Sequence, residues 1–344
     1  MLDPFLIVIV VLALAFDFIN GFHDTANAIA TSVLTKALTI PAAILMAAAL
    51  NFAGAFVSEA VAGTIGKGIV DPVAVTHGVV MAALIGAITW NLITWYYGLP
   101  SSSSHALIGG LIGAAGLSQF KWVQENGTVS WRLHYGVFEA AGLEKTLIAL
   151  FVSPLAGYIG GFFLMVLLLW LFRRATPWRL NHGFRYLQVV SAAFMAFSHG
   201  GNDAQKSMGI ISMALLSGGF ISSFHIPAWV KVACATAMAL GTAFGGWRII
   251  RTIGRNVMEL KFIHGFAAET AAALVIQMAT HVGAPVSTTH VISSSIMGVG
   301  SSRRLSSVRW KIAANIVTAW IFTIPAAAAL AMFSYWVMAS LGCR

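Results

Sequence analysis

The sequence predicts an all-α polytopic membrane protein with two inverted repeats of about five transmembrane helices each, plus re-entrant or half-helix segments. Three observations predict this fold: an apolar composition, an internal duplication and an uneven placement of basic residues. Hydrophobic residues make up 58% of the chain and charged residues only 9%, whereas soluble domains are about a quarter charged. Since one span takes about 20 apolar residues, roughly ten spans fit along the 344 residues.

The duplication shows as three pairs of similar segments that occur in the same order. They are Phe18–Asp24 with Phe197–Asp203, Thr64–Lys67 with Thr252–Arg255, and Gly98–His105 with Gly283–His290. Such internal similarity predicts a first repeat over 1–172, a basic linker over 173–186 and a second repeat over 187–344. Residues 118–145 form a polar insertion in the first repeat, and we expect an external loop with an interfacial helix there.

Basic residues predict the orientation. Most of them gather in three groups: Arg173, Arg174, Arg179 and Arg185; Arg248, Arg251, Arg255 and Lys261; and Arg303, Arg304, Arg309 and Lys311. If each repeat crosses the membrane five times and the segments around Asp24 and Asp203 are re-entrant, these groups lie inside and both termini outside. The alternative, in which the two Asp segments span fully, places Arg251–Lys261 outside. An odd number of crossings makes the repeats inverted.

The net charge of +9 therefore fits cytoplasmic loops of a multi-pass protein in the cell (plasma) membrane, and we expect no nucleic-acid partner. Acidic residues inside apolar stretches are costly and usually functional. Five acids lie in or beside such stretches: Asp17, Asp24, Glu59, Asp203 and Glu269.

Two of these acids recur in matching motifs. Asp24 and Asn27 are three residues apart, so they share a helix face, and their oxygens suit a small hard cation or a proton. Gly21 allows the backbone to break just before them. In the second copy Asp203 matches Asp24, but Lys206 stands where Asn27 stood.

The segments that begin with Pro100 and Pro285 predict two half-helices. Each proline is followed by hydroxyl residues that can cap free amides: Ser101, Ser102, Ser103 and Ser104 in one copy, Ser287, Thr288 and Thr289 in the other. Two helix N-termini that face each other form a site for a tetrahedral oxyanion. We therefore expect a carrier of a small inorganic anion. His105, His290 and Gln205 are candidates for supporting these groups from behind.

At these residues the chain resembles the inorganic phosphate transporter (PiT) family. The resemblance rests on Gly21–Ala28, Ser198–Asp203, Pro100–His105 and Pro285–His290. It implies a homodimer that moves phosphate in symport with a cation and needs no organic cofactor. The phosphate site that it implies comprises Asp24, Asn27, Ser103, Ser104, Asp203, Ser287, Thr288 and Thr289. It also implies a role in coupling for Glu59 and Glu269.

Lys206 departs from the sodium-coupled members of that family, which usually carry asparagine at this position. A lysine supplies a fixed positive charge beside the anion and can replace one bound sodium ion. The coupling cation is a proton or sodium, and because of Lys206 we expect a proton. Transport of phosphate as a metal–phosphate complex is the other possibility that the lysine favours. The carboxyl group of Glu269 or Asp203 would bind the transported proton.

Three other functions are alternatives to phosphate symport. Sulfate is also a tetrahedral oxyanion, so a sulfate symporter on the same fold is the nearest alternative. A channel or a membrane receptor is a second, because acids and hydroxyls also line pores. A membrane enzyme is not expected, because the sequence shows no nucleophile–base pair and no H-E-x-x-H metal motif.

Overall fold

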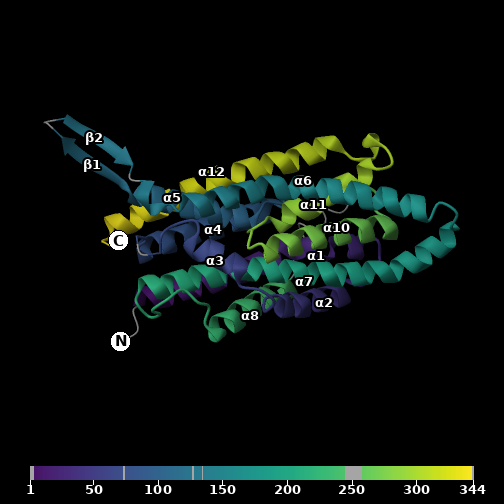
Figure 1. The fold of residues 1–344 in the computed structure, drawn as a ribbon, viewed down its shortest axis with the longest axis horizontal. Coiled ribbons are helices and arrows are strands. Elements are labelled where there is room, and N and C mark those ends of the chain that lie inside the picture. The colour runs from purple at the N-terminus through teal and green to yellow at the C-terminus, as the bar shows by residue number, and fades with distance from the viewer. Residues whose placement is uncertain (1–3, 73, 126–127, 134, 245–257, 343–344) are drawn as a thin grey trace.

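The computed structural model describes residues 4–72, 74–125, 128–133, 135–244 and 258–342. Most helices run side by side along one long axis (Figure 1). The first part of the chain forms α1 (Pro4–Leu34), α2 (Ile40–Gly54), α3 (Ala60–Lys67), α4 (His77–Tyr97), α5 (Ser103–Ser118), β1 (Phe120–Glu125), β2 (Thr128–Leu133), η1 (Tyr135–Val137) and α6 (Ala140–Leu171). The second forms α7 (Pro177–Ser217), α8 (Ala228–Phe244), α10 (Phe262–His281), α11 (Thr288–Ser301), η2 (Leu305–Ser307) and α12 (Trp310–Ser340).

The outer helices expose large apolar side chains. Five helices in the described ranges, α1, α4, α6, α10 and α12, are long and apolar enough to cross a membrane. Large hydrophobic side chains point outward from α6 and α12, for example Phe151, Phe163 and Phe333. The prediction of an all-helical membrane protein is confirmed, apart from one small hairpin of strands. In the described ranges these five helices stand against the expected number of about ten spans, and α2, α5, α8 and α11 are shorter than a full span requires.

The aspartate segments are not re-entrant. Asp24 lies inside α1 and Asp203 inside α7, and both helices continue without interruption on either side. Gly21 does not break α1. A Cβ atom at Gly21 would collide with the carbonyl oxygen of Met238, so this glycine lets α8 pack closely against α1. The expectation of a backbone break was wrong because close helix contact also requires glycine.

Two helical hairpins reach the middle of the molecule instead. The chain turns after α4 at Gly98, which has a φ of 65°, and after α10 at Gly283, with a φ of 66°. Ser102 and Ser287 then cap the new helices by accepting hydrogen bonds from the backbone N–H groups of His105 and His290. The half-helix prediction is therefore confirmed for α5 and α11. The hairpins α4–α5 and α10–α11 come from opposite ends of the bundle (Figure 1).

Helices from the first part of the chain pack against helices from the second part. Helix α1 packs on α8 and α7 packs on α2, while α5 packs on α12 and α11 on α6. Each pairing thus has a counterpart with the two parts reversed. Buried Ala and Gly residues lie at many of these contacts, and their small size lets the helix backbones approach closely.

The insertion at 118–145 contains no interfacial helix in its described residues. It forms the antiparallel hairpin β1–β2, in which Trp122 pairs with Trp131, followed by η1. Alternation of polar and apolar residues in Thr128–Arg132 suits a strand, and the interfacial-helix prediction overlooked this period. The repeat copy Thr252–Arg255 and the basic residues Arg248 and Arg251 lie outside the described residues.

Candidate functional site

The tips of the two hairpins meet the polar segments of α1 and α7 in the middle of the bundle. Eight polar residues come together there, and none has more than 2% of its surface exposed. We call them the central polar cluster: Asp24, Asn27, Ser103, Ser104, Asp203, Lys206, Thr288 and Thr289. The structure thus brings together the side chains that the sequence singled out. Ser287, the remaining one, lies beside them and caps α11.

Each aspartate accepts a hydrogen bond from the hairpin of its own half. The hydroxyl of Ser103 donates to Asp24 Oδ2 over 2.9 Å, and the hydroxyl of Thr288 donates to Asp203 Oδ2 over 3.2 Å. The hydroxyl of Thr289 also lies 3.3 Å from Asp24 Oδ1. These contacts hold both carboxylates at the N-terminal ends of α5 and α11, where the helix dipoles favour negative charge.

The third residue after each aspartate reaches the opposite hairpin. Asn27 Nδ2 donates to Thr289 Oγ1 over 2.8 Å, and Lys206 Nζ donates to Ser104 Oγ over 2.5 Å. Ser104 in turn donates to the carbonyl oxygen of Val286 over 3.0 Å. The two hairpin tips therefore contact each other directly and are also tied together through α1 and α7.

Lys206 is the cationic centre of the cluster and is fully buried. Its Nζ donates to Asp203 Oδ1 over 2.5 Å and to the carbonyl oxygen of Val286 over 3.2 Å, in addition to Ser104. A buried ammonium group is tolerated only with such partners, because it has lost its water. Lys206 thus adds a full positive charge between two helix N-termini, which is an arrangement that attracts an anion.

Two histidines beside the aspartates were not predicted as site residues. His23 Nδ1 lies 2.8 Å from Asp24 Oδ1, and His199 Nε2 lies 3.4 Å from Asp203 Oδ2. Asp24, His199 and Asp203 each offer one ligand atom within 4.8 Å of the other two, a spacing that a small cation can bridge. The sequence did carry a signal, since a histidine precedes the aspartate by one residue in one copy and by four in the other.

The amide of Asn27 leaves one acceptor open. Its Oδ1 is buried and has no hydrogen-bond partner within the part of the chain that the structure describes. Together with the oxygens of Asp24, it forms the oxygen-rich side of the cluster, which suits a cation, opposite the ammonium group of Lys206.

Glu269 lies next to the cluster. It is fully buried on α10 and accepts hydrogen bonds from Thr31 of α1 and from Ser191 of α7, the latter over 2.5 Å. Thr31 follows Asn27 by one helical turn. Glu269 therefore connects the helices of the cluster from one side.

Glu59 and Gln205 lie elsewhere than expected. Glu59 stands at the beginning of α3 with 51% of its side chain exposed, in an ion pair with Lys231 of α8. Gln205 Oε1 accepts hydrogen bonds from the backbone of Val61 and Ala62, so it anchors α3 to α7. The structure does not bring either residue into the central polar cluster.

His105 and His290 lie behind the hydroxyl groups, as expected of supporting residues. Their rings are 4.4 Å apart between centroids, and His290 stacks on Trp320 at 3.9 Å. His105 Nδ1 is 2.8 Å from the hydroxyl of Ser102. These contacts fix the first turns of α5 and α11 relative to each other.

Comparison with known proteins points to one family. Residues 20–331 match the model described as "Phosphate transporter family". A "Probable low-affinity inorganic phosphate transporter" of Rhizobium meliloti is 48% identical over 334 residues, and one of Bacillus subtilis is 48% identical over 335, each covering 96% of both chains. A solved structure called "The sodium-dependent phosphate transporter" has the same fold, with a TM-score of 0.86 at 24% identity over 98% of this chain and 99% of that chain.

Proposed function

This chain belongs to the phosphate transporter family, whose members are transporters and not enzymes, and from that premise we propose that it imports inorganic phosphate by symport with a cation. The observation that carries the proposal is the central polar cluster. It combines two capped helix N-termini, four hydroxyl groups and one ammonium group in a buried site. Oriented backbone N–H groups, hydroxyls and lysine are the groups that bind phosphate in proteins.

The carboxylates support phosphate over sulfate. Hydrogen phosphate carries a proton that it can donate to Asp24 or Asp203, whereas sulfate carries none. A buried acceptor that meets another acceptor loses its hydrogen bond and repels it. The site residues that we assign to phosphate are the central polar cluster and Ser287.

We therefore expect a large excess of sulfate to leave phosphate uptake nearly unchanged. The measurement is uptake of radiolabelled phosphate into proteoliposomes, with and without unlabelled sulfate, and with unlabelled phosphate as the positive control. Accumulation above the external concentration separates a symporter from a channel. Equal inhibition by the two anions would show a sulfate-tolerant carrier, and uptake that stops at equilibrium would show a channel.

Two inverted repeats underlie this site in our proposal, over 1–172 and 187–344, with the linker 173–186 between them. The reciprocal helix contacts and the opposed hairpins support it (Figure 1). The family resemblance supports a homodimer.

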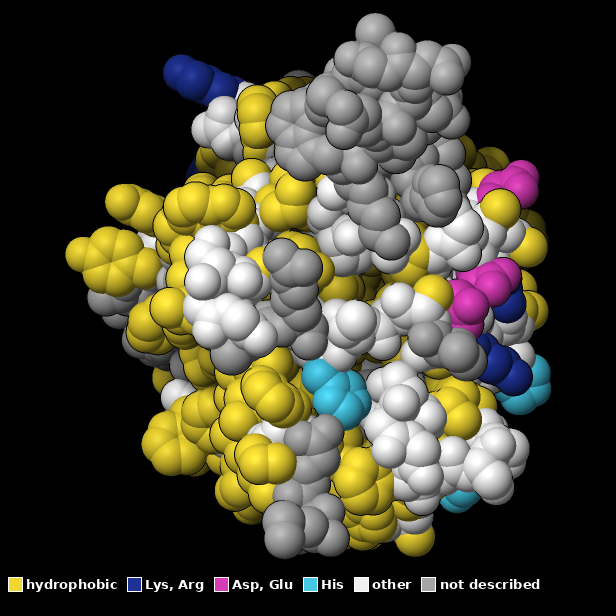
Figure 2. Space-filling model, turned by 90° about the vertical axis from the view of Figure 1, so that its left-hand side faces the viewer, with side chains coloured by type: hydrophobic (Ala, Val, Ile, Leu, Met, Phe, Trp, Pro, Cys, Tyr) yellow, Lys and Arg dark blue, Asp and Glu magenta, His cyan; other side chains and the backbone are white. Residues whose placement is uncertain are grey.

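Both termini lie at one end of the bundle and the linker lies at the other (Figure 1). The end with the termini shows few Lys and Arg side chains among those described (Figure 2). We place that end outside the plasma membrane because basic residues favour the cytoplasmic side.

Coupling to a proton, or transport of a metal–phosphate complex, is favoured over sodium. Lys206 Nζ occupies the space between Asp203 and Ser104, so a fixed charge stands where a second cation would otherwise bind. Glu269 is the proposed proton carrier, since it accepts hydrogen bonds from the hydroxyl groups of Thr31 and Ser191, which are neutral. Glu59 remains a coupling candidate through its pairing with Lys231, which links α3 to α8.

Replacing Glu269 with glutamine should remove the response of uptake to a pH gradient. Glutamine keeps an oxygen that can accept a hydrogen bond from Thr31 or Ser191 but cannot take up or release a proton, so we expect uptake to fall to the level measured without a pH gradient. The measurement is initial uptake at several imposed pH gradients. Glu144→Gln is the matched control, because Glu144 is exposed in the first turns of α6, away from the cluster. Unchanged pH dependence in Glu269→Gln would exclude Glu269 as the proton carrier.

A further inference from the structure

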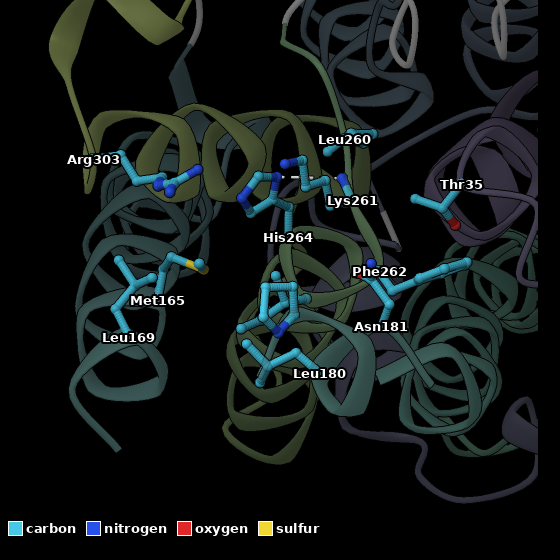
Figure 3. Close-up of a pocket in the computed structure, with 12 residues that line it drawn as sticks. Thr35, Met165, Leu169, Leu180, Asn181, Leu260, Lys261, Phe262, His264 and Arg303 are labelled. Atoms are coloured by element: carbon cyan, nitrogen blue, oxygen red, sulfur yellow. Dashed lines mark hydrogen bonds between the residues drawn. The ribbon is translucent and has the colours of Figure 1, made fainter. Parts of the chain in front are cut away.

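A second polar site lies near the end of the bundle that carries the linker. A pocket of about 460 Å³ opens there between α6, α7 and α10 (Figure 3). Arg303, Lys261 and His264 come together on one side of it, and Met165, Leu169 and Leu180 form an apolar wall (Figure 3). The pocket is separate from the central polar cluster and shares no residue with it.

The basic side of this pocket has an excess of positive charge, with two cations, Arg303 and Lys261, and one acid, Glu259, near His264. Among the described residues no acid forms an ion pair with Arg303 or Lys261. His264 is occupied by the backbone, since its Nδ1 accepts from the N–H of Lys261 over 3.2 Å. Two cations at the edge of a pocket that form no ion pair with an acid attract an anionic group.

An exposed tryptophan next to the pocket indicates how deep the pocket lies in the bilayer. Trp170 directly follows the pocket residue Leu169 and is 61% exposed. The guanidinium of Arg173 lies 5.6 Å from its ring. Exposed tryptophan beside arginine marks the boundary between hydrocarbon and water. The pocket therefore lies at the level where lipid phosphates are found.

We propose that this pocket binds the phosphate headgroup of an anionic phospholipid, with Arg303 and Lys261 holding the phosphate and an acyl chain lying against Met165, Leu169 and Leu180. Basic pockets between membrane helices on the cytoplasmic side bind such headgroups. Free phosphate shares the charge chemistry, but it would leave most of a 460 Å³ space and its apolar wall unfilled. The volume, the wall and the depth together favour a lipid.

A bound lipid would also act on the transport helices. Thr35, in the pocket wall just after α1, donates a hydrogen bond to Gln188 Oε1 over 2.8 Å, and Gln188 adjoins Glu269. The first turn of α10 forms another part of the wall. The lipid therefore contacts the inner ends of α1, α7 and α10, and we expect anionic lipid to change the transport rate.

The test measures lipid retention on the full-length protein. The protein is purified from bilayers of phosphatidylcholine with added phosphatidylglycerol, and bound lipid is counted by native mass spectrometry. Since each basic residue near a membrane contributes about 1 kcal/mol, Arg303→Gln with Lys261→Gln should weaken the preference for phosphatidylglycerol about thirtyfold. Leu180→Trp, which fills the pocket but keeps both charges, should also reduce retention.

The control is Arg304→Gln, which removes a neighbouring exposed charge that does not line the pocket. It should retain phosphatidylglycerol as the unchanged protein does. If Arg304→Gln lost as much phosphatidylglycerol as the double variant, the lipid would be held by the general positive charge of this surface, and the proposal would be overturned. Displacement of the lipid by inorganic phosphate or glycerophosphate at comparable concentrations would show a free-phosphate site instead and would also overturn it. Neither result depends on whether the central cluster transports phosphate.

Discussion

Replacing Asp203 with asparagine is expected to abolish phosphate uptake and to lower the thermal stability of the protein. Asp203 is the carboxylate that pairs with the fully buried Lys206 over 2.5 Å. Removing one partner of a buried ion pair costs about 3–5 kcal/mol, because the other charge remains without compensation. Uptake into proteoliposomes and the melting temperature in detergent measure the two effects.

The double variant Asp203→Asn with Lys206→Asn separates these effects. It removes both charges of the pair, so the melting temperature should recover most of the loss while uptake stays low. Asp203 Oδ2 also accepts a hydrogen bond from the hydroxyl group of Thr288, and the second substitution does not restore the negative charge at that acceptor. If the double variant were as unstable as Asp203→Asn alone, the instability would not come from an uncompensated Lys206.

Replacing Lys206 alone with asparagine should make uptake depend on sodium. The ammonium group contacts Asp203, Ser104 and the carbonyl oxygen of Val286, all of which are oxygen ligands that a sodium ion can use. Asn27 holds the matching position in the first half of the chain, so an asparagine fits this helix face. We expect uptake by Lys206→Asn to be roughly tenfold lower without sodium than with it, the effect of about 1.4 kcal/mol in cation affinity.

Initial uptake at a series of sodium concentrations checks this expectation. Lys311→Asn is the matched control, because Lys311 is an exposed lysine in the first turn of α12 and lies outside the central polar cluster. A Lys206→Asn protein that transports equally well with and without sodium would show that the lysine does not replace a cation.

The two hairpin tips were predictable from sequence because their signals are local. A proline, a run of hydroxyl residues and an apolar run specify a capped helix start, and Ser102 and Ser287 occupy the expected capping positions. Duplication added information, since Asp24 and Asp203 stood out only because they recur. We could predict that these residues form one site because they occur once in each half of the chain, and no single motif would have predicted it.

Features that depend on packing between distant segments could not be predicted. Gly21 looked like a break in the backbone, but its role is set by α8, more than 200 residues later in the chain. Glu59 looked like a membrane acid, and only the fold shows that α3 begins there at an exposed position. The roles of His23 and His199 follow from side-chain distances that sequence spacing alone does not provide.

In our proposal the cluster around Asp24, Asp203 and Lys206 moves phosphate with a proton or as a metal complex. The most direct test is phosphate uptake into proteoliposomes with the sodium and pH gradients varied independently, with and without a divalent cation. We expect accumulation without sodium when a pH gradient, acidic outside, is imposed, and we expect Asp203→Asn to abolish it. Uptake that requires sodium, and that neither a pH gradient nor a divalent cation restores, would show that sodium is the coupling ion.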